Sequence, residues 1–386
     1  MTKNLNLRKV FFLALLMFCA NLFAAGNGYT PQKREFRGAW IQCVNGQFIG
    51  MSTQKMQQTL AYQLDELQKD GVNAIFFQVR AECDALYKSD IEPWSRFLTG
   101  VQGKAPQPYW DPLQWMIEQC HKRGMELHAW LNPYRAKTKF TSTLDPKHVA
   151  MKHPGRVFPY DGLFILNPGL RENREYIIKV VDDIVERYDI DGIHLDYIRY
   201  PEQVAIPRQK LSSARNNITR IVKTITHRVK AIKPWVKMAC SPLGKYADLP
   251  RYSSRDWNAR DRVFQEAQAW LKQGLMDQLY PMMYYQGNNF YPFAADWKEN
   301  SCGRTVAAGL GTYFLDPREG HWQLPDVARE MMVVRQLGLG TAHFSAINLV
   351  RNQKGILDFT TEFYSPYPAL VPAMTWASQK KPAQPT

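Results

Sequence analysis

A carboxylate, a guanidinium and two phenols stand close together in one short stretch of the chain. Asp196, Tyr197, Arg199 and Tyr200 directly follow the apolar segment 192–195. Polar groups at the carboxyl end of a buried strand are typical of the sites that barrels and open α/β sheets carry. The alternative is a structural Asp196–Arg199 ion pair that caps the strand. The ends of the other predicted strands therefore decide which interpretation is favoured.

Polar and aromatic side chains follow several other apolar segments in the same way. Glu82 and Asp84 come after residues 72–79, where a carboxylate has no packing role, so we expect one of them to be functional. The remaining candidates for substrate binding are Trp40, Arg80, His128, Trp130, Asn132, Tyr134, Arg135, His194, Arg199 and Tyr285. If these strand ends meet around one axis, they form an aromatic-walled cleft with acids and guanidiniums. Such a cleft suits a polyhydroxylated, partly anionic ligand.

Paired carboxylates indicate hydrolysis of a glycosidic bond, in which one acid donates a proton and the other acts as a charged group. Asp196 is best placed as nucleophile or base, with Glu82 first and Asp84 second as a proton donor of raised pKa. The sequence holds no G-x-S-x-G stretch for serine chemistry. His128 and His194 are too scattered for a metal cluster, so we expect neither a metal nor a cofactor.

Structural roles stay open for four of these residues. His128 and His194 lie inside predicted strands, where hydrogen-bonded core histidines are common, and Trp40 and Trp130 could fill the interior of a barrel. Each candidate is weak alone, and only the repetition at successive strand ends favours a site.

Alternating strand-like and helix-like segments must position these residues. Strands are predicted at 35–42, 72–79, 125–131, 192–195, 236–241, 276–283, 305–309 and 341–344, and helices at 53–70, 112–124, 171–188, 211–233, 261–273 and 325–337. Residues 88–110 and the segment from 136 to about 167 are predicted as long loops. Eight units without a linker predict a single (β/α)8 TIM barrel, an α/β fold, over residues 33–350. An open doubly wound sheet is the alternative, but no glycine-rich loop follows the first strand. Residues 351–376 are expected to pack on the barrel and residues 377–386 to form a disordered tail.

The first 25 residues have the pattern of an export signal. Lys3, Arg8 and Lys9 precede an apolar run at 10–20, and small residues suitable for cleavage end it. We therefore expect an exported protein of the periplasm or cell envelope, without a transmembrane segment in the mature chain. Cys19 raises the alternative of a lipoprotein, although the residues before it lack the small side chains that lipid attachment needs.

Charge and cysteine content exclude other classes of protein. The formal net charge is +14, but the lysines and arginines are scattered, which argues against a nucleic-acid partner. The five cysteines after the signal show no C-x-x-C pairing, so a zinc site is not expected. Their odd number favours buried free thiols over a disulfide framework.

Several motifs together resemble the glycosyl-hydrolase-like family-10 proteins over roughly residues 33–350. The matching stretches are FRGAWIQ at 36–42, QVR at 78–80, DALY at 84–87, HAWLNPYR at 128–135, LNPG at 166–169, DGIHLDYIRYP at 191–201 and YPMMYYQ at 280–286. The resemblance implies a (β/α)8 barrel, export to the envelope and glycosidase activity on glycan chains. It also implies a catalytic Asp196, with Arg80, Asn132, Tyr134 and Arg199 on the substrate side.

The resulting hypothesis is an exported glycoside hydrolase that uses carboxylate acid/base chemistry. Within the resembled family, a bacterial lipoprotein acts on peptidoglycan strands that have lost their stem peptides, and this polysaccharide is the substrate we expect here. The alternatives are a non-catalytic glycan-binding barrel and a hydrolase of another polysaccharide. Neutral glycans would leave the arginines without an anionic partner, which favours the peptidoglycan strand.

Overall fold

The computed structural model describes residues 32–139, 141, 143–202, 204 and 206–378. The chain divides into two units, Met1–Lys33 and Arg34–Thr386, and the second contains every helix and strand described. The expected export signal at 1–25 and the expected tail from residue 379 onwards lie outside the described residues.

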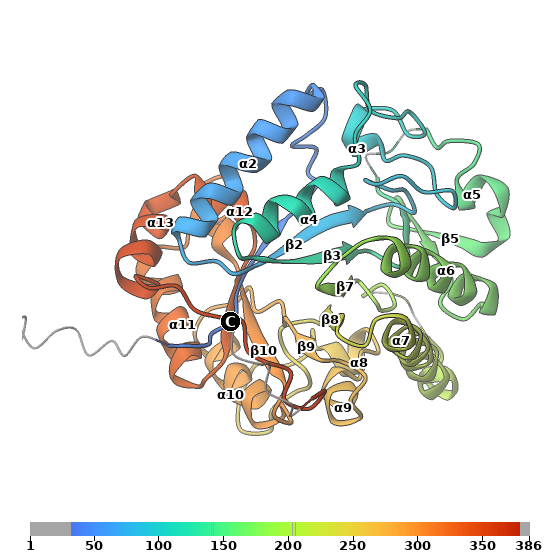
Figure 1. Ribbon diagram of the computed structural model, residues 1–386. Helices are drawn as coiled ribbons and strands as arrows, with labels where there is room; N and C mark the ends of the chain where they lie inside the picture. The colour runs from blue at the N-terminus through green and yellow to red at the C-terminus, as the bar shows by residue number, and fades with distance from the viewer. Residues whose placement is uncertain (1–31, 140, 142, 203, 205, 379–386) are drawn as a thin grey trace, which may run out of the picture. The chain divides into compact units, whose positions relative to one another are not determined.

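Eight parallel strands close into a barrel, which confirms the predicted single (β/α)8 fold (Figure 1). Each barrel strand pairs with the next barrel strand along the chain, and the last one, β11, pairs with the first, β1. The strands are β1 (Arg37–Ile41), β2 (Ala74–Arg80), β3 (Glu126–Leu131), β7 (Gly192–Asp196), β8 (Lys237–Ser241), β9 (Gln278–Leu279), β10 (Thr305–Leu310) and β11 (Gly340–His343). Because all run in one direction, the residues after each strand meet at a single rim.

The helices follow from apolar spacing and capping. In α2 (Thr53–Lys69), Met56, Leu60, Leu64 and Leu67 are buried, and Ser52 accepts a hydrogen bond from the amide of Lys55 at the start. The other helices of six or more residues are α4 (Pro112–Lys122), α6 (Arg171–Arg187), α7 (Leu211–Ile232), α9 (Ala267–Lys272), α10 (Tyr291–Glu299) and α11 (Leu324–Gln336). Shorter helical turns are α3 (Arg96–Thr99), α5 (Val149–Lys152), α8 (Ala259–Arg262), α12 (Ala346–Val350) and α13 (Ile356–Phe359).

The barrel interior is filled with aromatic rings. Phe36, Phe76 and Tyr280 are fully or almost fully buried there, and the imidazole of His194 stacks on Tyr280 with ring centroids 5.2 Å apart. A second apolar layer lies between the strands and the surrounding helices. The axis is therefore a packed core, and space for a ligand is found at the rim.

Several segments differ from the sequence prediction, including α10, which lies where no helix was predicted. The helix expected at 261–273 is split into α8 and α9, because Phe264 adopts a left-handed backbone with φ of 64°. The strand expected at 276–283 keeps only Gln278–Leu279, since Pro281 cannot donate to the ladder. The loop expected after residue 135 contains an antiparallel sheet of β4 (Arg135–Lys137), β6 (Leu163–Leu166) and β5 (Val157–Tyr160).

The segment after α13 lies against the amino-terminal end of the barrel. The amide of Glu35 donates to Leu370 O at 3.0 Å, and Asn73 Nδ2 donates to Ala369 O at 2.9 Å. Further along, Trp376 Nε1 donates to Asp277 Oδ1 at 2.7 Å, just before β9. Among the described helices, none combines the length and hydropathy that a membrane crossing requires.

Candidate active site

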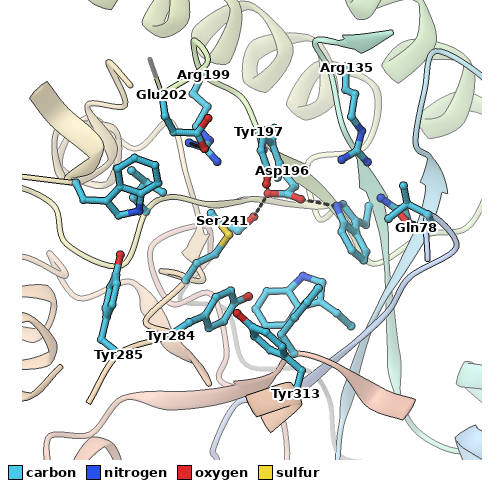
Figure 2. A pocket seen from close by; sticks show the side chains of 17 residues that line it. Gln78, Arg135, Asp196, Tyr197, Arg199, Glu202, Ser241, Tyr284, Tyr285 and Tyr313 are labelled. Atoms are coloured by element: carbon cyan, nitrogen blue, oxygen red, sulfur yellow. Dashed lines mark hydrogen bonds and ion pairs between the residues drawn. The ribbon is translucent and has the colours of Figure 1, made fainter. Parts of the chain in front are cut away.

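A cavity of about 490 Å³ opens at the carboxyl ends of the barrel strands (Figure 2). Its wall is aromatic, and two carboxylates, Asp196 and Glu202, are among its lining side chains. The aromatic lining consists of Trp40, Trp130, Tyr197, Trp257, Tyr284, Tyr285, Tyr313 and Phe344. A concave site with aromatic walls and few polar groups is typical of a small-ligand or sugar site.

Asp196 is held by four hydrogen-bond donors at the end of β7. Oδ2 accepts from Trp130 Nε1 at 3.2 Å and from Asn132 Nδ2 at 3.1 Å. Oδ1 accepts from Ser241 Oγ at 2.8 Å and from the amide of Tyr197 at 2.9 Å. Burial raises the pKa of the carboxyl group above its usual value, against the lowering effects of the Ser241 hydroxyl and the nearby guanidiniums. The donors fix the orientation of the group and favour its charged form.

The amide of Asn132 links Asp196 to two other strand ends. Its Oδ1 accepts from Gln78 Nε2 at 2.7 Å and from Arg135 Nη2 at 2.8 Å, so Nδ2 must face the carboxylate. Gln78 in turn accepts from the amides of Cys43 and Val44, each at 3.0 Å. This network holds the loop after β1 against β2 and β3.

On the other side of Asp196, Ser241 connects the carboxylate to His194. His194 Nε2 lies 3.1 Å from Ser241 Oγ, and burial lowers the pKa of this imidazole well below its usual value. The same nitrogen accepts from Trp40 Nε1 at 3.5 Å, since an indole N–H can only donate. The imidazole therefore orients Ser241 from inside the barrel and does not face the cavity.

Tyr197 has a conformation that bulky residues rarely adopt. Its φ is 54°, and its ring is 40% exposed. The Arg199 guanidinium lies over that ring at 4.2 Å from the centroid, and the Arg135 guanidinium lies at 5.7 Å. Arg199 Nη1 also forms an ion pair with Glu202 Oε1 at 2.6 Å. Backbone strain beside Asp196 thus places a phenol between two cations at the cavity surface.

The cavity brings together six of the residues proposed from the sequence, and three others lie close to it. The six that line it are Asp196, Trp40, Trp130, Arg135, Arg199 and Tyr285. Asn132 and His194 lie behind Asp196, and Tyr134 lines a neighbouring cavity. The geometry is consistent with the roles expected for these residues, which stay predictions.

Arg80 lies beneath the site, and the structure does not place it against a ligand. It is fully buried, and its Nη2 pairs with Glu92 Oε1 at 2.7 Å. Its Nη1 donates to Asn132 O at 2.7 Å, so it positions the backbone of a residue that contacts Asp196. Likewise, His128 is buried in the barrel interior beside Glu126, with Nε2 to Oε2 at 3.1 Å, and does not reach the cavity.

Glu82 and Asp84 are also buried outside the cavity. Glu82 Oε1 accepts from the amide of Thr138 at 2.6 Å and from Thr141 Oγ1 at 2.7 Å. Asp84 accepts from the amide of Glu82 at 3.0 Å, and burial together with the charge of Glu82 raises its pKa to about 6. Both side chains are fully buried, and Glu82 binds Thr138 and Thr141. Neither carboxylate lines the cavity, so the expectation that one of them lies beside Asp196 needs correction.

The site contains functional candidates that the sequence reasoning missed. Glu202 is the foremost, and the available signal was its position directly after the Arg199-Tyr200-Pro201 stretch. Ser241 and Gln78 lie at the ends of predicted strands, but their side chains are neutral, so the sequence gave no reason to select them as site residues. Three aromatic residues that line the cavity were also not selected from the sequence: Trp257, Tyr284 and Tyr313.

Neither metal-ligand clusters nor disulfides contribute to the site in the part of the chain that the structure describes. No three His, Cys, Asp or Glu side chains of that part are arranged to hold a metal ion. Its cysteines are free, with Cys43, Cys83, Cys120 and Cys240 buried and Cys302 exposed.

Comparison with known proteins gives one family and several relatives. The family model for glycosyl hydrolase-like 10 matches residues 35–308. Glycosyl hydrolase YngK of Bacillus subtilis is 36% identical over 390 residues, which cover 91% of this chain and 76% of YngK. Glycosyl hydrolase DigH of Escherichia coli is 33% identical over 260 residues, which cover 59% of this chain and 58% of DigH. The match thus spans less than two thirds of DigH.

Two solved structures share the fold at low sequence identity. The glycoside hydrolase domain of PgaB from Bordetella bronchiseptica gives a TM-score of 0.59 at 12% identity, covering 86% of this chain and 98% of that domain. The catalytic domain of beta-amylase from Paenibacillus polymyxa gives 0.58 at 10% identity, covering 87% and 99%. These likenesses support the barrel fold alone.

Proposed function

This chain belongs to the glycosyl hydrolase-like 10 family, and we propose that it is an exported glycoside hydrolase that cleaves peptide-free peptidoglycan strands. The observation that carries the proposal is Asp196, a carboxylate held by four donors in an aromatic-walled cavity at the barrel rim. Relatives named glycosyl hydrolases support the reaction class.

Asp196 acts as the charged carboxylate of the reaction. Cleavage of a glycosidic bond develops positive charge at the anomeric carbon, and a fixed anion beside that carbon stabilises it or attacks it. Hydrogen bonds from Trp130, Asn132, Ser241 and the Tyr197 amide hold Asp196 for this task and cost no reorganisation during the reaction.

Glu202 is the second carboxylate in our proposal and the donor of a proton to the leaving oxygen. It is the other acid that lines the cavity, and it is ion-paired with Arg199 at 2.6 Å. Proton donation requires Glu202 to leave the ion pair with Arg199 and to face the leaving oxygen with a proton. This assignment replaces Glu82 and Asp84, which are fully buried and do not line the cavity.

The lining favours an acidic glycan over a neutral one. Rings such as Trp257 and Tyr285 offer flat apolar faces for sugars, while Arg135 forms no ion pair with any carboxylate in the described ranges. Peptidoglycan strands without stem peptides carry free lactyl carboxylates, which supply the missing anion. The expected export signal at residues 1–25 would bring the enzyme to this polymer.

The test is digestion of intact and amidase-treated peptidoglycan, with soluble products identified by mass spectrometry. We expect wild type to release sugar-only fragments from the amidase-treated polymer, and Asp196→Asn to release none. Glu319→Gln, which changes an exposed carboxylate outside the cavity lining, should behave as wild type. Equal release by Asp196→Asn would remove this residue from the mechanism. Binding without release by wild type would favour a glycan-binding barrel.

A further inference from the structure

A second cavity of about 330 Å³ adjoins the one that contains Asp196. The two cavities share the lining residues Val44, Arg135, Tyr197, Arg199 and Glu202. On its far side, the second cavity is bounded by Tyr160, Leu163 and Ile165 from the β4–β6–β5 sheet. The insertion after β3 thus extends the binding surface beyond the barrel rim.

Two guanidiniums, those of Arg135 and Arg199, line the junction between the cavities. Arg135 donates Nε to Ala81 O at 2.8 Å and Nη2 to Asn132 Oδ1 at 2.8 Å, but it pairs with no described carboxylate. Arg199 has one carboxylate partner, Glu202, and its Nε has no hydrogen-bond partner among the described residues. Two carboxylates, Glu202 and Asp196, line the larger cavity near these guanidiniums, and the charges of both Arg135 and Arg199 act on Asp196 (Figure 2). Arg199 is buried, and a buried donor without a partner is costly unless a ligand supplies an acceptor.

A buried phenol of the second cavity also has an unmet hydrogen bond. Tyr134 is 1% exposed and lines this cavity, yet its hydroxyl has no partner within the described ranges. A buried hydroxyl without a partner costs free energy, which a bound polar group can recover. Between the cavities, the exposed ring of Tyr197 offers a face against which a sugar can pack.

We propose that the second cavity is a subsite for a carboxylate-bearing sugar unit, whose carboxylate binds Arg135 and Arg199. Guanidiniums suit this role because their planar donors match the two oxygens of a carboxylate. The inference rests on the proposed function, since it places the acidic unit next to the bond that Asp196 acts on. The carboxylate can belong to the sugar ring, as in a uronic acid, or to an ether-linked lactyl group.

The proposal is tested by calorimetric binding to the full-length Asp196→Asn protein, which does not consume the ligand. The probes are a tetrasaccharide of peptide-free peptidoglycan, the same compound with its carboxyl groups reduced to alcohols, and a uronic-acid tetrasaccharide. We expect reduction to weaken binding by about 10-fold to 100-fold, the range for hydrogen bonds to a charged group. Preference between the two acidic probes identifies the source of the carboxylate.

Added Arg135→Gln and Tyr134→Phe changes separate recognition from support of the site. With Arg135→Gln, the acidic probe should lose affinity while the reduced probe keeps its own, so the discrimination between them shrinks. Tyr134→Phe removes a hydroxyl that the proposal does not assign to the carboxylate, so both probes should lose affinity equally. The control is Arg171→Gln, which changes an exposed arginine paired with Glu175 on α6. Equal affinity for acidic and reduced probes, or equal losses for both in Arg135→Gln, would overturn the subsite.

These readouts distinguish failure of the subsite from failure of the proposed function. Selective binding of the acidic probe with no hydrolysis by wild type would keep the subsite and reject the enzyme. Hydrolysis of the strands without selectivity for the carboxylate would keep the enzyme and reject the subsite.

Discussion

Replacing Ser241 with alanine should move the acidic limit of activity to higher pH. Ser241 Oγ donates to Asp196 Oδ1 at 2.8 Å, and this hydrogen bond lowers the pKa of a carboxyl group that burial raises. Removing the donor destabilises the charged form, so the pKa of Asp196 must rise further. Because the proposed mechanism needs Asp196 charged, activity should then fail at a higher pH than in wild type.

The size of the shift follows from the loss of one donor among four. A hydrogen bond to a charged group contributes about 1.5–3 kcal/mol. One pKa unit corresponds to about 1.4 kcal/mol, so the limit should move by about one to two pH units. Asp196 is only 6% exposed, which restricts replacement of the hydroxyl by bulk water.

The assay is the pH profile of kcat/KM on peptide-free glycan strands, whose acidic limb reports a group of the free enzyme. Ser345→Ala is the matched control, because its buried hydroxyl bonds Asn348 Oδ1 at 2.7 Å on the same rim and does not contact Asp196. If the acidic limb of the kcat/KM profile stays at the wild-type pH or moves to lower pH, the assigned role of Ser241 is refuted. Loss of activity at every pH would place Ser241 in the chemistry itself.

Three further changes test the supporting structure. Glu92→Gln should lower the free energy of unfolding by about 3–5 kcal/mol in urea titrations, because it leaves the buried guanidinium of Arg80 without its anion. The control is Glu175→Gln at an exposed ion pair, which should change the free energy of unfolding by less than about 1 kcal/mol. Burial raises the pKa of Asp70 from 3.8 to about 7, so its stabilising contribution is complete below pH 4 and is lost as the pH rises through 7. Asp70→Asn should therefore flatten the dependence of unfolding free energy on pH between 4 and 8, and an unchanged dependence would contradict the assignment. Leu64→Ala, at a fully buried position of α2, should cost about 2–5 kcal/mol, whereas Tyr62→Ala, at an exposed one, should cost far less by the same titration.

The fold could be predicted because strand-length apolar runs recur at regular spacing. The segment AIFFQVR at 74–80 is predicted as a central strand because it is mostly apolar, and all seven of its residues are buried in the structure. The short β4–β6–β5 sheet escaped prediction because strands of three or four residues, such as RAK at 135–137, show no periodicity. Its pairing depends on contacts with residues about 30 positions away.

The site follows most directly from the sequence where strand direction alone decides the position of a side chain. Asp196 is the last residue of β7, and its place at the rim follows from the barrel. Glu82 lies two residues beyond the end of β2, and its path depends on a loop that contacts it from Thr138, 56 positions later. Sequence gives the types of residue near a strand end, while the turn after the strand determines which of them reach the cavity.

The two ends of the described barrel unit leave it on the side opposite the cavity. Arg34 pairs with Leu370 in a parallel bridge next to the start of β1, and Arg34 Nη1 donates to Val371 O at 2.8 Å. A solid support, a fluorescent tag or a fused module joined near either position would therefore leave the rim facing solution. Long, insoluble polymers could then be presented to an immobilised form of the protein without obstruction from its own attachment point.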